Sequence, residues 1–201
     1  MSRPDRVVLA TNNAKKLVEL RRVVEEAGLS VQVLGLADFP RYPDPAETES
    51  TFEGNAFLKA EAAMLATGVP AIADDSGIQV DELNDMPGVR SARWAGPQHD
   101  DVDNLNLLLA QLDGVPAERR GARFVCALAY VAPDGERHLW RGVMPGRLAE
   151  APRGSNGFGY DPIFVPDGCD VTSAELSPSD KDAISHRGQA VRAFVAWLKE
   201  S

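Results

Sequence analysis

Residues 7–34 read VVLATNNAKKLVELRRVVEEAGLSVQVL. Residues 7–10 form a short apolar run that is typical of a buried strand. Apolar residues then recur at spacings of three and four, which predicts a helix that ends near Gly28. A second apolar run at residues 31–34 predicts another strand. The chain therefore opens as β-α-β, with a polar turn between the first strand and the helix.

The rest of the chain alternates between predicted helices and strands. Further helices are expected over residues 52–65, 105–112 and 191–198. Strands are expected over residues 71–73, 78–80, 124–131, 138–143 and 162–165, and a loop over residues 84–99. Pro133-Asp134-Gly135 is a typical turn sequence, so the strands around it predict a hairpin. Ser179 and Asp182 resemble a capping box. Together these elements predict an α/β fold with a mixed sheet.

The composition excludes several classes of protein. The 201 residues carry 21 Lys and Arg against 30 Asp and Glu, a formal net charge of −9. The apolar content is too high for a disordered acidic chain, and the acidic balance argues against a general nucleic-acid binder. The length predicts one domain over residues 1–201. We see no membrane span, no signal region and no disulfide scaffold, and expect a cytoplasmic protein that binds neither membrane nor nucleic acid.

Common catalytic signatures are missing from the sequence. It contains no P-loop, no G-x-G-x-x-G dinucleotide fingerprint and no G-x-S-x-G nucleophile elbow. The three histidines are far apart in the chain, and no Cys or His lies at the spacing of a zinc site. A functional site is therefore expected among the polar segments that remain.

Two polar segments follow predicted strands. Residues 11–16 read TNNAKK, and free N–H groups at a helix start favour an anion. Taken alone, the segment favours an ordinary Asn cap followed by solvated lysines, because Asn caps are common. Residues 74–77 read DDSG at the end of the third strand. Adjacent carboxylates point to opposite faces of a strand, so one can face a ligand while the other makes hydrogen bonds. An Asx-type turn is the alternative for this segment.

Two more polar segments lie near the C-terminus. Residues 152–161 are rich in glycine, which permits positive φ and close approach of the backbone. Phe158 and Tyr160 in this segment can stack on a base, unless they belong to the core. Lys181 and residues 185–188, SHRG, lie near a helix start, where cations oppose the helix dipole. They supply donors for an oxygen-rich ligand, or form a solvated run of charge.

These segments together supply cations for phosphates, carboxylates for a hard metal ion and aromatic rings for a base. Mg²⁺ prefers one or two carboxylates together with the phosphate oxygens of a substrate. The combination predicts Mg²⁺-dependent hydrolysis of a nucleoside phosphate. It also explains how an acidic protein binds an anion.

Six motifs in the same order make the chain resemble the inosine triphosphate pyrophosphatase family over about residues 7–190. They are TNNAKK at 11–16, TFEGNA at 51–56, ADDSG at 73–77, PGVRSAR at 87–93, GFGYDP at 157–162 and ISHRG at 184–188. The resemblance implies hydrolysis of the purine nucleotides dITP, ITP and XTP to the monophosphate and pyrophosphate, which cleans the nucleotide pool. It also implies a homodimer and an elongated, twisted mixed sheet flanked by helices, with two lobes and a central cleft.

The resemblance also implies residue roles. Asp75 is expected to be the general base and, with Glu47, a ligand of Mg²⁺. The residues implied in substrate binding are Thr11, Asn12, Asn13, Ala14, Lys15, Lys16, Lys59, Ser76, Phe158, Gly159, Tyr160, Asp161, Lys181, His186 and Arg187. Some family members carry Glu directly before the helix Asn, where this chain has Gly54. Glu53 is expected to face elsewhere and is left out of the site.

Three other functions stay open. A Nudix hydrolase has a near-match at residues 21–29, but Arg22 replaces the first Glu of its motif, so an amphipathic helix with solvated charges is the preferred interpretation. A non-catalytic nucleotide-binding module needs no metal carboxylate. A pyrophosphatase for modified pyrimidine nucleotides differs in the base that it accepts.

Overall fold

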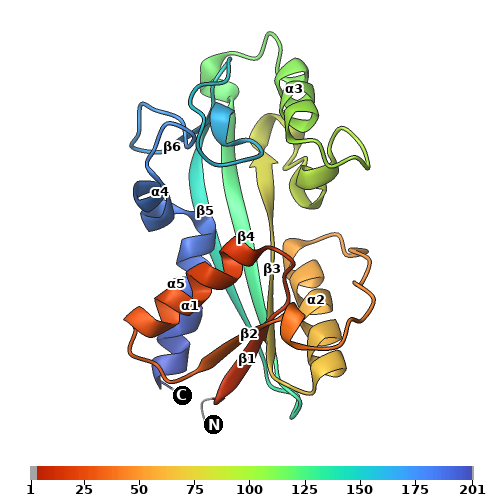
Figure 1. Ribbon diagram of the computed structural model, residues 1–201. Coiled ribbons are helices and arrows are strands. Elements are labelled where there is room, and N and C mark those ends of the chain that lie inside the picture. The colour runs from red at the N-terminus through yellow and green to blue at the C-terminus, as the bar shows by residue number, and fades with distance from the viewer. Residues whose placement is uncertain (1–3, 201) are drawn as a thin grey trace. The chain divides into compact units, whose positions relative to one another are not determined.

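The computed structural model describes residues 4–200 and contains one mixed six-stranded sheet (Figure 1). Its strands follow the order β2-β1-β3-β4-β5-β6. Their bounds are Arg6–Leu9 (β1), Gln32–Gly35 (β2), Ala71–Val80 (β3), Gly121–Val131 (β4), Arg137–Leu148 (β5) and Phe164–Pro166 (β6). β1 pairs in parallel with β2 and β3, whereas β5 pairs antiparallel with β6. The predicted mixed α/β fold is therefore confirmed.

Helices precede or follow most of these strands in the described part of the chain. Their bounds are Ala14–Glu26 (α1), Phe52–Thr67 (α2), Asp101–Gln111 (α3), Pro178–Ile184 (α4) and His186–Glu200 (α5). Short 3-10 turns cover Leu36–Asp38 (η1), Asp81–Leu83 (η2), Gly88–Arg93 (η3), Ala117–Arg119 (η4) and Asp161–Ile163 (η5). No helix within residues 4–200 is both long and apolar enough to cross a membrane.

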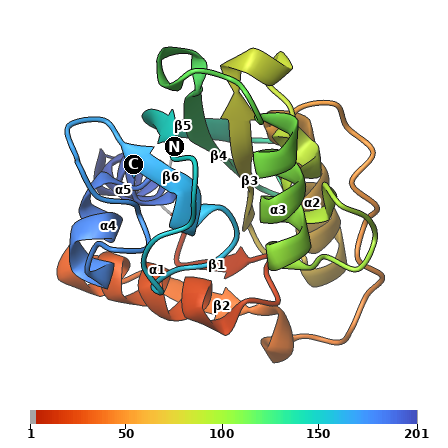
Figure 2. The ribbon, with the colours of Figure 1, turned by 90° about the horizontal axis from the view of Figure 1, so that it is seen from above.

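The chain divides into two compact units, which agrees with the expectation of two lobes. The first unit contains the described residues up to Asp75, residues 127–141 and the described residues from Ala190 on. The second contains Ser76–Cys126 and Gly142–Gln189. Seen from above, β5, β4 and β3 follow one another across the sheet (Figure 2). The assignment of residues 1–201 to a single domain stays a prediction.

The first unit is built around β1. Residues 7–9 of this strand are fully buried, as the apolar run predicts. Asn13 caps α1 by accepting the N–H of Lys15, and Gly28 follows the helix at φ 70°. Thr51 caps α2 in the same way through the N–H of Gly54. The buried alanines of α2, Ala56, Ala60 and Ala63, let that helix lie close to its neighbours. Leu65 was expected with them but is 73% exposed, because it lies on the opposite face of α2.

The second unit has an apolar core of its own. Leu105, Leu108 and Leu112 of the α3 segment pack with Ile78 and Val80 of β3 and with residues of β4, β5 and the segment 160–164. The predicted spacing of leucines therefore marks the buried face of α3.

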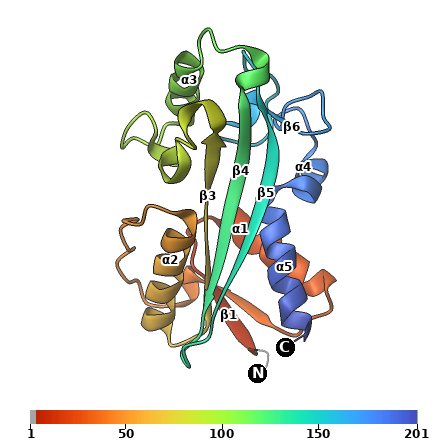
Figure 3. The same ribbon diagram turned by 180° about the vertical axis from the view of Figure 1, so that it is seen from behind.

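The short turn at 132–136 joins neighbouring strands β4 and β5, and its Gly135 N–H donates to the Ala132 carbonyl, which confirms the predicted hairpin. The long strands β3, β4 and β5 lie side by side in Figure 3.

Four sequence predictions need correction. Residues 74–77 do not end a strand: β3 runs from Ala71 to Val80 without interruption, because the apolar residues that follow are buried in the same extended segment. β6 begins at Phe164 rather than at 162, since η5 precedes it. The cap of α4 is Ser177, which accepts the N–H of Asp180, and Ser179 lies inside the helix after Pro178. The loop at 84–99 contains η3.

Candidate functional site

Asp74 and Asp75 lie side by side in β3 but contact different helices. The Lys16 ammonium of α1 lies 2.5 Å from Asp74 Oδ2, and the Lys59 ammonium of α2 lies 2.8 Å from Asp75 Oδ1. Successive side chains of a strand point to opposite faces of the sheet. This places α1 and α2 on opposite faces, and α1 passes in front of the strands in Figure 1 and behind them in Figure 3. The expectation that the two carboxylates diverge is confirmed.

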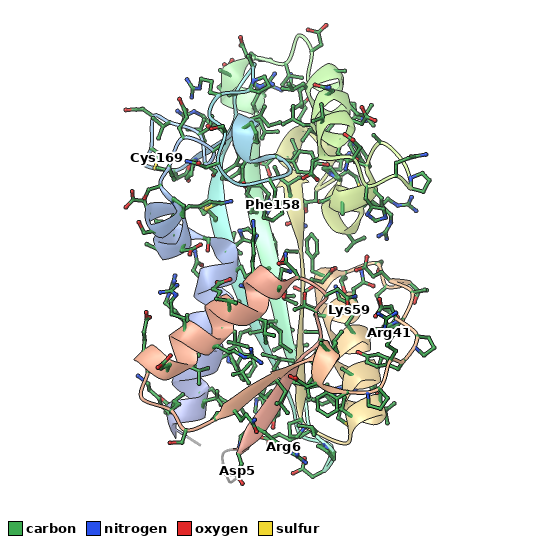
Figure 4. The ribbon with its side chains drawn as sticks, viewed as in Figure 1. Asp5, Arg6, Arg41, Lys59, Phe158 and Cys169 are labelled. Atoms are coloured by element: carbon green, nitrogen blue, oxygen red, sulfur yellow. The ribbon has the colours of Figure 1, made fainter. Side chains whose placement is uncertain are left out.

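Lys59 brings two carboxylates together. Its Nζ lies 3.2 Å from Glu47 Oε1 as well as 2.8 Å from Asp75 Oδ1. Glu47 comes from the loop before α2, whereas Lys59 lies within α2 and is labelled in Figure 4. The two predicted metal ligands therefore converge on one ammonium. We call Lys16, Glu47, Lys59, Asp74 and Asp75 the carboxylate–lysine group.

Asn55 is a site residue that the sequence reasoning left out. It is fully buried in α2, and its Nδ2 donates to Asp75 Oδ2 over 3.4 Å and to the Glu49 carbonyl over 3.4 Å. Its Oδ1 accepts the N–H of Glu49 at 3.1 Å. Asn55 thereby fixes the loop that carries Glu47 relative to Asp75. The motif at 51–56 contains this Asn, so a buried polar residue in a matching motif was the available signal.

Burial and neighbouring charges set the protonation of this group. Burial raises the pKa of the Asp75 carboxyl above its ordinary value, and the Lys59 ammonium offsets part of the rise. Burial alone lowers the pKa of Lys59, but the carboxylates of Asp75, Glu47 and Asp74 outweigh it and raise that pKa. Lys59 is therefore held as an ammonium, while Asp75 binds a proton more readily than an exposed Asp.

The carboxylates of the group suit one kind of metal ion. Within residues 4–200 no three His, Cys, Asp or Glu side chains form a ready metal cluster. Two buried or half-buried carboxylates nevertheless face one cation, Lys59. This fits Mg²⁺, which needs only one or two protein carboxylates when substrate phosphates complete its shell. It does not fit a metal held by protein ligands alone.

The turn at 11–16 is mostly exposed. The Asn13 side chain caps α1 by accepting the Lys15 N–H, and Thr11 Oγ1 accepts a hydrogen bond from the Asn13 N–H at 3.2 Å. Asn12 donates to Asp44 at 3.2 Å, which ties the turn to the loop that leads to Glu47. Lys15 and Ala14 are exposed in the first turn of α1. The structure thus brings Lys16 to the carboxylate–lysine group, while the anion role of the other turn residues stays a prediction.

In the second unit, residues 157–161 form what we call the Phe158 loop, with Phe158 labelled in Figure 4. The Phe158 side chain is 73% exposed. Asp161 is buried, accepts the Phe158 N–H at 2.9 Å and forms an ion pair with Lys181. The Lys181 ammonium lies 5.4 Å from the centre of the Phe158 ring. The loop therefore presents an open aromatic face beside a buried ion pair.

Tyr160 differs from Phe158 in its surroundings. Its side chain is 4% exposed, and its hydroxyl donates to the Ser91 carbonyl at 2.8 Å. Of the two aromatic rings predicted to stack on a base, only Phe158 is accessible, because Tyr160 packs in the core of its unit. Gly157 at φ 78° and Gly159 at φ 59° shape the loop, and a Cβ on Gly157 would collide with Asp161.

Three further predicted residues also lie in the second unit. The Ser185 hydroxyl accepts the N–H of Gly188, so Ser185 caps the start of α5, where His186 and Arg187 lie. The His186 ring stacks on Phe124, with ring centres 5.0 Å apart and planes within 12°. Ser76 Oγ is buried and, among residues 4–200, has no hydrogen-bond partner. A buried hydroxyl without a partner has hydrogen-bonding capacity left for a ligand.

The near-match to a Nudix motif does not form a site. Arg22 and Glu26 pair with each other on the exposed face of α1 at 3.0 Å. Arg21 donates from Nε to the Val33 carbonyl. Residues 21–26 thus belong to an amphipathic helix with solvated charges, as the sequence interpretation had it. Glu53 Oε1 lies 3.5 Å from Arg141 Nε of β5. Its exclusion from the site stays a prediction.

Known proteins resemble this chain over nearly its full length. The Ham1 family matches residues 7–197. A dITP/XTP pyrophosphatase of Cutibacterium acnes is 58% identical over 94% of this chain and 94% of its own, and one of Nocardia farcinica is 57% identical over 96% and 94%. The structure of the Staphylococcus aureus Ham1 protein superimposes with a TM-score of 0.90 at 40% identity, covering 97% and 98% of the two chains. These matches confirm the resemblance seen in the sequence.

Proposed function

Because the chain belongs to the Ham1 family, we propose that it hydrolyses the non-standard purine nucleotides dITP, ITP and XTP to the monophosphate and pyrophosphate. The observation that carries the proposal is the convergence of the Glu47 and Asp75 carboxylates on Lys59. Relatives at 57–58% identity are named dITP/XTP pyrophosphatases, which supports the same substrates here. Such an enzyme removes non-standard triphosphates from the nucleotide pool, and we place it in the cytoplasm.

The carboxylate–lysine group is assigned to the triphosphate. Glu47 and Asp75 would hold Mg²⁺, which supplies charge neutralisation at the phosphate oxygens when it is bound. Lys16 and Lys59 each lie against a carboxylate, so a phosphate oxygen can take over part of the ion pair that each ammonium makes. The turn residues Thr11 and Asn13 at the start of α1 add donors for the phosphate chain.

Asp75 is assigned as general base. A water oxygen attacks the α-phosphorus, the bond from this phosphorus to the bridging oxygen breaks, and pyrophosphate leaves with the electron pair. The proton of the water passes to an Asp75 carboxylate oxygen. Burial raises the pKa of Asp75, which makes this carboxylate a better proton acceptor than an exposed one. Asn55 holds the same carboxylate by a hydrogen bond and so orients it.

The second unit is assigned to the base. The open ring of Phe158 is suited to stacking on a purine. Donors of His186, Arg187 or the backbone pair with the 6-keto oxygen of hypoxanthine or xanthine, and they meet the 6-amino group of adenine unfavourably. One buried donor left unmatched costs about 1–3 kcal/mol, so two reject adenine by roughly a hundredfold or more. Lys181 forms an ion pair with Asp161, and its ammonium places a positive charge beside the Phe158 ring.

A pyrophosphate-release assay tests the proposal. dITP, XTP, dATP and dGTP are each incubated with the protein, with and without Mg²⁺, and the nucleotide product is identified by chromatography. We expect metal-dependent pyrophosphate and monophosphate from dITP and XTP, with the standard nucleotides nearly inert. Equal turnover of dATP and dITP contradicts the base selectivity, and orthophosphate as product contradicts attack at the α-phosphorus.

Further outcomes of the assay separate the remaining candidates. Tight dITP binding without product indicates a non-catalytic nucleotide-binding module, and turnover of modified pyrimidine nucleotides indicates the related pyrophosphatase. We also propose a homodimer, in line with the family resemblance. Light scattering of the purified protein at several concentrations checks that assembly.

A further inference from the structure

Two residues outside the Phe158 loop hold it through hydrogen bonds. The N–H of Gly159 donates to Asp101 Oδ2 at 3.0 Å, and the Tyr160 hydroxyl donates to the Ser91 carbonyl at 2.8 Å. Ser91 belongs to η3 and Asp101 to α3. Both bonds end on the two residues that directly follow Phe158. The orientation of the exposed ring therefore depends on contacts with η3 and α3.

Ser91 is itself firmly placed. It is 7% exposed, and its hydroxyl accepts the N–H of Ile78 at 2.9 Å while donating to the Gly88 carbonyl at 2.6 Å. Ile78 lies in β3, two residues after Ser76. The Ser91 hydroxyl thus accepts a hydrogen bond from a backbone N–H of β3, and the Ser91 carbonyl accepts the hydrogen bond from the Tyr160 hydroxyl of the loop. A rigid core element carries the Tyr160 anchor.

Asp101 occupies the first turn of α3. Asp100 caps this helix by accepting the N–H of Asp103, and the buried Leu105 and Leu108 fix the helix in the core. The carboxylate of Asp101 is therefore presented from a fixed helix end, although the side chain itself is exposed. Asp103 lies in the same turn and is also exposed, and its N–H donates to Asp100 Oδ1.

The loop needs external anchors because its own backbone is permissive. Gly157 and Gly159 both adopt positive φ, and glycine gives a chain many alternative conformations. A loop that must be ordered when a ligand binds weakens the affinity, whereas a loop held in the bound conformation does not. We propose that Ser91 and Asp101 are positioning residues, which hold the Phe158 loop ready to stack on the purine base without touching the substrate. This inference rests on the proposed function.

Substitutions at Asp101 test one anchor. Asp101→Ala removes the acceptor for the Gly159 N–H, and one hydrogen bond of this kind corresponds to about a fivefold change in an equilibrium. We expect the KM for dITP to rise about fivefold with kcat unchanged. Asp101→Asn keeps an acceptor oxygen and should restore most of the affinity. Asp103→Ala removes the same charge from the same helix turn and should leave both constants unchanged.

Tyr160→Phe tests the second anchor by removing only the hydroxyl that reaches Ser91. Its matched control is Tyr130→Phe, which deletes the hydroxyl of a buried tyrosine in the first unit. We expect Tyr160→Phe to raise the KM for dITP and to weaken inhibition by the product dIMP, while inhibition by pyrophosphate stays the same. A fall in kcat with unchanged KM, or equal weakening of pyrophosphate inhibition, overturns the positioning role.

Hydrogen exchange gives a readout that does not need activity. Peptides covering residues 157–161 should exchange faster in Asp101→Ala and Tyr160→Phe than in the wild type, and at the wild-type rate in Asp103→Ala. Unchanged exchange in both loop variants overturns the inference, whatever the activity. Wild-type protein without dITP turnover instead contradicts the proposed function. Wild-type turnover with an unchanged KM in both variants contradicts only the positioning role.

Discussion

The carboxylate–lysine group and the Phe158 loop are held together by different interactions. In the first, each ammonium lies against a carboxylate: Lys16 against Asp74, and Lys59 against Glu47 and Asp75. In the second, the backbone N–H groups of Phe158 and Gly159 and the Tyr160 hydroxyl make the fixing bonds. The first is a set of mutually compensated charges. The second is a loop whose conformation is fixed by hydrogen bonds and which exposes one aromatic ring.

This difference suits the two regions to different kinds of ligand group. Buried charges need partners, and an ion pair can exchange one partner for a phosphate oxygen or a metal ion without leaving the other charge exposed to an apolar surrounding. A flat base offers few charges, so its binding depends on a surface that is already in place. Variants of the first group should therefore change kcat, whereas variants of the loop should change KM.

Asp75→Asn should have the largest effect and tests the chemical half of the comparison. Loss of the base and of a metal ligand should lower kcat by about a thousandfold or more. The folded protein should not lose stability at neutral pH. Burial raises the pKa of Asp75 in the folded state, so its ionisation costs stability as the pH rises from the ordinary pKa through the folded-state pKa, and Asn does not ionise. Steady-state kinetics and thermal unfolding at pH 7 measure both effects.

Glu53→Gln is the matched control for Asp75→Asn. It removes a carboxylate of the same unit that pairs with Arg141 and that we leave out of the site. Its kcat should stay within about twofold, as for most surface substitutions away from a site. A loss of less than tenfold in Asp75→Asn, or an equal loss in Glu53→Gln, removes Asp75 from the role of general base.

Much of the first region could be predicted from sequence because it depends on local signals. The apolar run at 7–10, the Asn cap and the spacing of leucines each act within a few residues. The divergence of Asp74 and Asp75 follows from the alternation of side chains along a strand. The continuity of β3 through Ser76 and Gly77 could not be predicted, since it depends on burial of the residues that follow.

The second region was less predictable because its contacts join segments far apart in the chain. Phe158 and Tyr160 look alike in the sequence, yet one is exposed and the other is buried with its hydroxyl on Ser91. The partners of the loop, Ser91 and Asp101, lie 69 and 58 residues away along the chain. Asn55 was visible in a motif, but only the fold shows that it bonds to Asp75.

Lys16→Ala should have the next largest effect and sharpens the claim that the first region works through charge. Loss of one preorganised cation at the phosphates should lower kcat/KM about a hundredfold. It also leaves the buried carboxylate of Asp74 without this ion pair, so the melting temperature should fall. Lys199→Ala is the control, because Lys199 is an exposed lysine of α5 in the same unit and is not among the residues implied in substrate binding. Equal losses in the two variants would mean that general surface charge, not the Lys16 position, attracts the substrate.

Phe158→Ala should have the smallest of these effects and tests the other side of the comparison. Stacking of a base on an aromatic ring contributes about 1–3 kcal/mol, so the KM for dITP should rise roughly tenfold while kcat stays the same. Because the side chain is 73% exposed, the substitution should leave the melting temperature unchanged. Phe158→Trp keeps an aromatic face and should retain affinity, and Leu139→Ala trims an exposed apolar residue elsewhere as a control. If Phe158→Ala instead lowers kcat at constant KM, the ring acts on the reacting phosphate, and the division between a catalytic region and a recognition loop is wrong.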